Sequence, residues 1–179
     1  MTSDLTVLAV ARWPEPGDAA PPPLPGYVVS SFNPLVAAVA DRCLRRRHGE
    51  PPTPADIGDR TAMVIVSASG DAVSQAHVHA AVGAGERVGP LFFFQSAPNS
   101  VAGHVAARWG LRGPVVCVRP IGSPRATALA QAELLFRDGD ADLALLVLAE
   151  QAASHDSAEA LLVTNAGASH RAMSTEGAP

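Results

Sequence analysis

The stretch VVCVRPIGSPRATALAQAELLFRDGDADLALLVL, residues 115–148, decides the fold. It opens with a short apolar strand and turns through Pro120, Ile121 and Gly122 into a helix that begins at Ser123-Pro124. A capping side chain followed by proline is a typical helix start. Asp138-Gly139-Asp140 ends the helix, and a second apolar strand follows. A strand, a helix and a strand in this order indicate an α/β domain.

The same alternation extends to both sides of this stretch. Apolar strands are predicted at residues 5–11, 61–67 and 160–164, and helices at 34–47, 71–82 and 99–109. We therefore expect an α/β fold with three αβα layers, in which helices cover both faces of a mostly parallel sheet. A single domain is expected over residues 1–166, with a proline-rich loop at 14–27 and a tail at 167–179 that is predicted to be disordered.

Composition excludes several classes of function. The chain has 179 residues, a net charge of −4 and no lysine, so we expect no nucleic-acid partner. No apolar run approaches the roughly 20 residues that a membrane-spanning helix needs, and no signal peptide is recognised. Cys43 and Cys117 lack the spacing of a metal site or a disulfide framework. We expect a cytoplasmic protein that binds no membrane, metal or cofactor.

Two apolar segments carry further expectations. Leu91-Phe92-Phe93-Phe94 holds three of the five phenylalanines and is predicted to belong to the core. The helix from Ser123 to Arg137 has apolar or small residues around most of its circumference, which is typical of a helix buried on several sides. Little sequence is left to cover it, and this predicts a partner chain.

Common catalytic motifs do not occur. No dinucleotide or phosphate-binding glycine pattern is present, and Ser67-Ala68-Ser69-Gly70 lacks the leading glycine of a hydrolase nucleophile elbow. His77 and His79 point to different faces of their helix, so they do not share a metal. The informative place is the turn before Ser123, because a helix start aims backbone N–H groups at a bound thiolate or anion. The residue at that turn is Gly122.

Three motifs together resemble the N-terminal half of the β-ketoacyl synthases. They are PNSVAGHVA at 98–106, WGLRGP at 109–114 and DGDADLAL at 138–145. In that family a P-N-x-x-A-G-H-like helix leads to G-L-x-G-P, a strand, the nucleophile turn, a long helix and a D-x-A-L strand. The spacing matches without a gap from Pro98 to about Leu148 and more loosely from Leu5. The resemblance implies half of a thiolase-like fold.

The resemblance places the catalytic cysteine of the family, the tenth residue counting from Gly113, on Gly122. Cys117 lies in the preceding strand, where its side chain is expected to pack instead of meeting substrate. The catalytic histidines belong to the C-terminal half of the family, to which this sequence has no counterpart. We therefore expect no catalysis by this chain on its own, and Gly122 and Ser123 are interpreted as a vestigial pocket.

The resemblance also implies partners. Chain-length factors of type II polyketide synthases lack the cysteine and pair with an active ketosynthase. The prediction is a non-catalytic accessory subunit of a bacterial ketosynthase or ketosynthase/chain-length-factor pair, in polyketide or fatty-acid-like biosynthesis. An acyl carrier protein and a second copy of the chain are further partners to consider. The family pairs its counterpart of residues 115–118 across the dimer, so Val115, Val116, Cys117 and Val118 are the predicted interface.

Two alternatives stay open at this point. The chain could supply one half of a split β-ketoacyl synthase, as its acyltransferase component. It could also be a degenerate remnant without a partner. Covalent transfer of an acyl group to the chain separates the first alternative from an accessory role.

Overall fold

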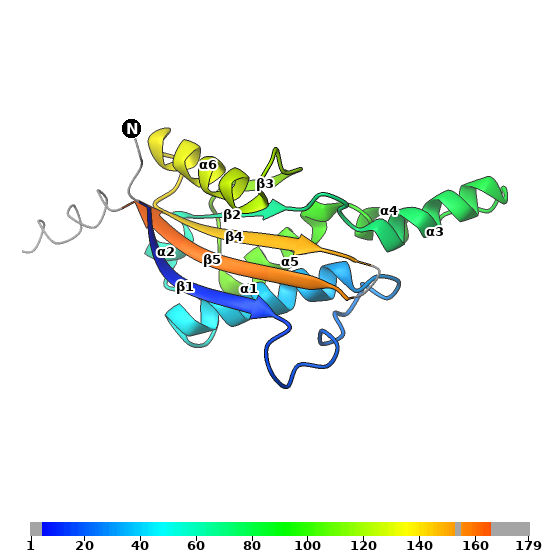
Figure 1. Cartoon of the computed structure of the whole chain (residues 1–179), viewed down its shortest axis with the longest axis horizontal. Helices are drawn as coiled ribbons and strands as arrows, with labels where there is room; N and C mark the ends of the chain where they lie inside the picture. Colours follow the sequence, from blue (N-terminus) through cyan, green and yellow to red (C-terminus); the bar gives the residue numbers. More distant parts are fainter. Residues whose placement is uncertain (1–4, 153–154, 166–179) are drawn as a thin grey trace, which may run out of the picture.

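The computed structural model describes residues 5–152 and 155–165, so the predicted tail at 167–179 lies outside the described residues. Five strands form one sheet in the order β1-β5-β4-β2-β3 (Figure 1). They are β1 (Leu5–Trp13), β2 (Thr61–Val66), β3 (Val115–Val118), β4 (Leu143–Glu150) and β5 (Ser157–Asn165).

Strand direction agrees with a mostly parallel sheet, with one departure. Strands β1, β4, β2 and β3 point the same way, and β5 runs antiparallel to both of its neighbours, β1 and β4. The reason is the short connection between β4 and β5, because parallel neighbours need a crossover of a dozen or more residues.

The helices confirm three αβα layers. Helices α1 (Phe32–His48) and α5 (Pro98–Trp109) pack on one face of the sheet, and α6 (Pro124–Arg137) packs on the other (Figure 1). A one-turn helix, α2 (Ala55–Gly58), precedes β2 and was not predicted. Among the described residues, no helix is long and apolar enough to cross a membrane.

Two apolar clusters hold these layers together. The larger one lies beneath α1 and α5 and fully buries Phe32, Leu35 and Trp109. The smaller one lies beneath α6 and includes Ala128, Ala132 and Leu135; the short side chains of the two alanines let the helix approach the sheet closely. Strand β2 is buried along its whole length because it runs between the two clusters.

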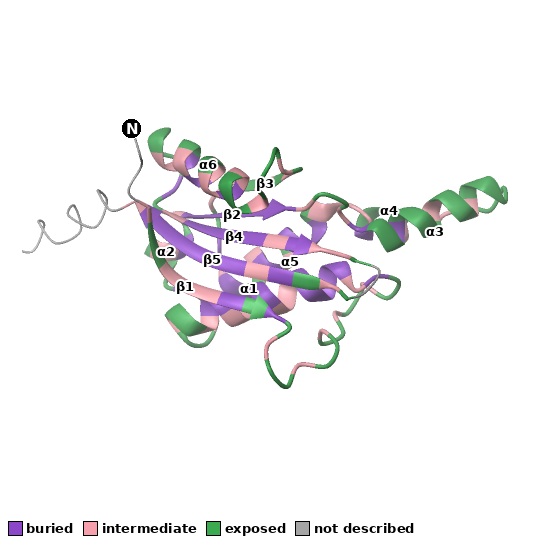
Figure 2. Cartoon of the chain, viewed as in Figure 1, coloured by how far each residue is buried: buried purple, intermediate pink, exposed green. Residues whose placement is uncertain are grey.

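Helix α6 is buried on one face only. Ala126, Ala130 and Leu134 are exposed on its outer face, and 38% of Leu134 is accessible (Figure 2). The prediction that this helix is buried on several sides is therefore wrong for the chain by itself. The sheet covers one side of the helix, and no other described element covers the opposite side.

Helices α3 (Ala72–Gly83) and α4 (Pro90–Gln95) extend from the end of the sheet away from the other elements (Figure 1). We call residues 72–95 the arm. The prediction that the phenylalanine run is core is wrong, because 69% of Phe93 and 62% of Phe94 are exposed on the arm (Figure 2). Phe92 instead contacts His77 of α3, with ring centroids 4.7 Å apart.

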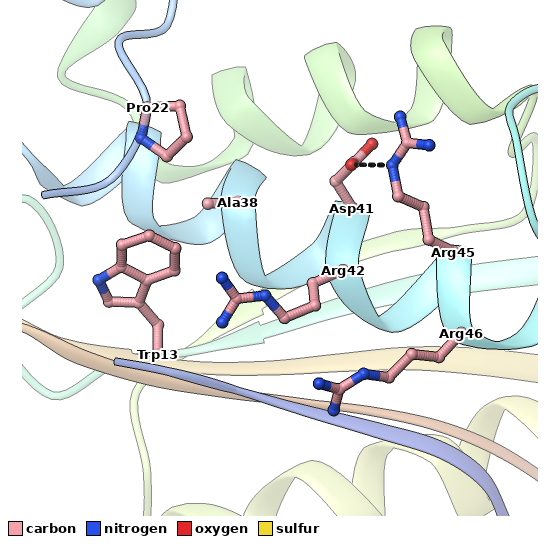
Figure 3. Close-up of a pocket in the computed structure, with 7 residues that line it drawn as sticks. All are labelled: Trp13, Pro22, Ala38, Asp41, Arg42, Arg45 and Arg46. Carbon is pink, nitrogen blue, oxygen red and sulfur yellow. Dashed lines mark hydrogen bonds and ion pairs between the residues drawn. The ribbon is translucent and has the colours of Figure 1, made fainter. Parts of the chain in front are cut away.

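The proline-rich loop is tied to α1 by arginines. The Arg42 guanidinium donates to both carboxylate oxygens of Asp18, each at 2.8 Å. It also lies 4.7 Å from the centre of the Trp13 ring (Figure 3). Arg46 donates to the Glu15 carboxylate at 2.7 and 2.9 Å. The hydrogen bonds from Arg42 lower the pKa of Asp18. Two loop carboxylates are thereby anchored to one helix.

Candidate functional site

The turn between β3 and α6 is held by two hydroxyl groups. Ser123 Oγ accepts a hydrogen bond from the Ala126 N–H at 3.4 Å and caps α6. Thr127 Oγ1 accepts from the Ile121 N–H at 3.0 Å and donates to the Ile121 carbonyl at 3.2 Å. The turn predicted from sequence is therefore a strand-to-helix connection held by side-chain hydrogen bonds on both sides of Gly122.

Gly122 stands at the centre of this turn. Its φ is +74°, a left-handed conformation that favours glycine, and a Cβ at this position would meet nothing within 4 Å. The position that the resemblance assigns to the nucleophile is thus exposed, has space for a side chain and carries none. Whether it forms a vestigial pocket for an acyl or pantetheine chain stays a prediction.

A solvent-open cavity of about 470 Å³ lies beside the start of α6. Its two sides are joined by Glu159, which accepts from Arg12 Nη2 at 2.9 Å and from Arg125 Nη1 at 2.8 Å. Ser123 belongs to the lining, whereas Gly122 does not. The lining residues are Arg12, Trp13, Pro14, Ser123, Pro124, Arg125, Leu148, Glu150, Ser157, Ala158 and Glu159.

The chemistry of this cavity is that of a binding surface. Among its described lining residues there is no cysteine or histidine, so it offers no thiol nucleophile and no imidazole base. The two arginines share one carboxylate, which balances part of their charge. The arrangement can hold a polar group by hydrogen bonds, and its described lining residues do not include a cysteine–histidine pair.

Cys117 lies on the other face of the sheet. It lines a separate cavity of about 170 Å³ with Ile65 and Pro98, whereas its neighbours Val116 and Val118 pack toward α6. The thiol is therefore separated from the Gly122 turn, as expected, although it is exposed at the sheet edge instead of packed. Desolvation raises the pKa of Cys117, which disfavours the nucleophilic thiolate.

Strand β3 forms one edge of the sheet. It pairs with β2, and among the described residues no strand pairs with its other side. The side chains of Val115 and Cys117 are exposed there, and those of Val116 and Val118 are half-buried. An exposed, apolar edge strand is a template for pairing with another chain. The interface role of these four residues stays a prediction.

Sequence reasoning missed the exposed apolar surface of the arm, which comprises Val73, Val82, Phe93 and Phe94. A signal was present in α3, because its apolar residues do not gather on one face. Such a helix does not fit on a sheet with one side in solvent. The core prediction for the three phenylalanines after α3 depends on their composition alone and does not take this pattern of α3 into account.

Comparison with known proteins agrees with this geometry. The family model of the β-ketoacyl synthase N-terminal domain matches residues 32–175. None of the curated proteins matches the chain.

Solved structures share the fold at low identity. A ketosynthase in complex with its chain length factor from Xenorhabdus doucetiae is 18% identical, with a TM-score of 0.68 over 90% of this chain and 79% of that chain. The ishigamide ketosynthase/chain length factor is 20% identical, with a TM-score of 0.69 over 86% of this chain and 49% of that chain.

A third structure is a type II polyketide synthase acyl-carrier protein in complex with its ketosynthase. It is 13% identical, with a TM-score of 0.64 over 95% of this chain and 60% of that chain. The chain thus spans about half to four fifths of the length of these structural neighbours. Since the family model covers most of the sequence, the chain belongs to the β-ketoacyl synthase N-terminal domain family.

Proposed function

We propose that this chain is a non-catalytic ketosynthase-like subunit that associates with a ketosynthase, or with a ketosynthase/chain-length-factor pair, in type II polyketide or fatty-acid-like biosynthesis. The observation that carries the proposal is glycine at the nucleophile turn, with φ at +74° and no thiol or imidazole among the described residues that line the adjacent cavity. The turn between β3 and α6 is formed, but Gly122 has no side chain that could act as a nucleophile. Binding is the role that such a site retains.

Uncovered apolar surface supports the association with another chain. Phe93 and Phe94 on the arm, Leu134 on α6 and Val115 on β3 are all substantially exposed. Burying a phenylalanine side chain fully contributes about 1.5–3 kcal/mol, so covering the two arm phenylalanines alone contributes on the order of 2–4 kcal/mol. An exposed set of this kind marks an interaction surface.

The structural neighbours support a ketosynthase-type protein as the partner. The first of them is described as a ketosynthase in complex with its chain length factor, and the match spans 79% of the aligned chain. A chain of comparable length with this fold therefore occurs within such a complex. We take ketosynthase-type subunits from the same organism as the first partners to test, with an acyl carrier protein as the next.

The test is co-expression of this chain with each ketosynthase-type subunit of the same organism, followed by size-exclusion chromatography with mass determination. A defined complex is expected, and Phe93→Ser/Phe94→Ser and Cys117→Pro should each weaken it at least tenfold. Val28→Ser is the matched control, because Val28 is exposed but lies just after the proline-rich loop and outside the arm, α6 and β3. A stable monomer that binds none of these subunits would overturn the proposal.

The split-enzyme alternative is tested in the same samples. Each complex is incubated with a mass-tagged acyl thioester, and the intact mass of this chain is measured with Cys117→Ala as the control. We expect no adduct on this chain. An adduct that survives in Cys117→Ala, or one that Cys117→Ala abolishes, would identify an acyl-carrying component and replace the accessory role.

A further inference from the structure

The two ends of the arm meet at one side chain. Asp71 caps the start of α3, and Gln95 is the last residue of α4. Asn33, the second residue of α1, donates its Nδ2 to Asp71 Oδ2 at 3.1 Å and to the Gln95 carbonyl at 3.3 Å. A single amide therefore bridges both points at which the arm joins the body.

This bridge is withdrawn from solvent. The exposed fractions are 2% for Asn33, 1% for Asp71 and 7% for Gln95. Water does not compete for hydrogen bonds at such a site, so each of them holds its partners more firmly than it would on the surface. The joint between arm and body is consequently polar and dry.

The orientation of the Asn33 amide is dictated by the arm. Both groups near Nδ2 are acceptors, so reversing the amide would place Oδ1 against a carboxylate and a carbonyl oxygen. In the present orientation Oδ1 has no hydrogen-bond partner among the described residues. A buried polar atom without a partner needs a reason, and here it is the use of both Nδ2 hydrogens on the arm.

Few other contacts fix the arm. Ser74 is the only residue of α3 that is buried, and its N–H bonds to Asp71 Oδ1 at 3.0 Å. The Val73 N–H reaches Gln151 Oε1 at 3.4 Å, a long hydrogen bond on the surface. Helix α4 also packs against α5 at its base. The direction of the arm therefore depends strongly on the Asn33 bridge.

We infer that Asn33 is a positioning residue that sets the angle of the arm and holds Phe93 and Phe94 ready for a partner chain. The partner-binding part of this inference rests on the proposed function. The positioning part concerns the chain alone. Holding the arm in its bound direction before association reduces the entropy lost on binding.

Hydrogen exchange followed by mass spectrometry tests the positioning part without any partner. In Asn33→Ala, amides of the arm should exchange at least tenfold faster than in the parent chain, while amides of β2 and β4 keep their rates. Thr53→Ala is the matched control, because Thr53 is also buried and its Oγ1 has no hydrogen-bond partner in the described part of the chain. It lies two residues before α2, which is at the opposite end of the sheet from the arm (Figure 1).

A second variant guards against general destabilisation. Asn33→Asp/Asp71→Asn exchanges acceptor and donor, so residue 71 can donate to residue 33, whereas the Gln95 carbonyl loses its donor. We expect protection to return at the start of α3 but not at the end of α4. Equal arm exchange in Asn33→Ala and Thr53→Ala, or protection that the double variant restores at both ends, would overturn the positioning role.

Partner affinity then separates this inference from the proposed function. With the co-expressed ketosynthase subunit, Asn33→Ala should bind at least tenfold more weakly than the parent chain, and Thr53→Ala should bind equally well. A faster-exchanging arm with unchanged affinity would keep the positioning role of Asn33 and refute partner docking through the arm. Unchanged exchange would refute the positioning role whatever the affinity.

Discussion

Gly122→Ala tests the backbone conformation that the turn between β3 and α6 requires. At φ +74° an alanine is strained by about 1–2 kcal/mol, while its smaller unfolded-state entropy returns about 0.4–1 kcal/mol. Since a Cβ there would meet nothing within 4 Å, no steric clash adds to this. The expected net loss is about 1 kcal/mol of unfolding free energy.

Gly103→Ala is the matched control, because the same substitution is expected to raise the free energy of unfolding there. Gly103 lies exposed within α5, and a Cβ there also meets nothing within 4 Å. Alanine in a helix interior should gain about 1 kcal/mol over glycine. The two variants should therefore differ by about 2 kcal/mol, which corresponds to roughly 4–8 °C in melting temperature.

Circular dichroism during thermal and urea unfolding measures both variants, in the complex if the chain needs its partner to stay folded. The reasoning is refuted if Gly122→Ala is as stable as the parent chain, because the turn would then not require a left-handed residue. A loss above about 3 kcal/mol would also refute it, since it would require a clash that the open surroundings of Gly122 exclude.

Three further outcomes are expected. Hydrogen bonds from Arg42 hold the pKa of Asp18 below its ordinary value of 3.8, so the stability they contribute is present above that value and is lost as the pH falls below it; Arg42→Ala should flatten the acid side of a melting-temperature profile. Burial raises the pKa of Cys43 to about 11, so iodoacetamide at neutral pH should label it only after unfolding, whereas exposed Cys117 should react slowly in the native chain. Gly113→Ala should lower the free energy of unfolding in urea by about 1–3 kcal/mol, because its Cβ would lie 2.5 Å from the Thr61 carbonyl oxygen; a variant as stable as the parent chain would mean that β2 and the segment before β3 are not in contact.

Local signals predicted the elements around the turn well. The predicted strand at 115–118 agrees with β3, and the Ser-Pro start and the Asp-Gly-Asp end bound α6 closely. These boundaries depend on residues within a few positions of one another. The exposure of Phe93 could not be predicted in this way, because it depends on the direction in which the arm leaves the sheet.

In the candidate site, too, a feature set by nearby residues could be predicted from the sequence, whereas contacts set by the overall fold could not. Gly122 was located by counting along a family motif, and its left-handed backbone agrees with a tight turn. The contacts of Glu159 with Arg12 and Arg125 join three distant parts of the sequence, and no periodicity marks them. They exist because β1, β5 and the start of α6 meet at one place in the fold.

The pairing of β1 has a consequence for synthesis. Strand β1, the first of the described strands, forms its ladder with β5, the last of them, and Leu5 lies opposite Asn165. At about 5–20 residues per second, a ribosome needs roughly 10–30 s to make the intervening chain. During that time β1, including Trp13, has no strand to pair with. Strand β1 is therefore exposed to chaperones and proteases until β5 has been synthesised, and a stop before Ser157 would leave β1 without its partner strand.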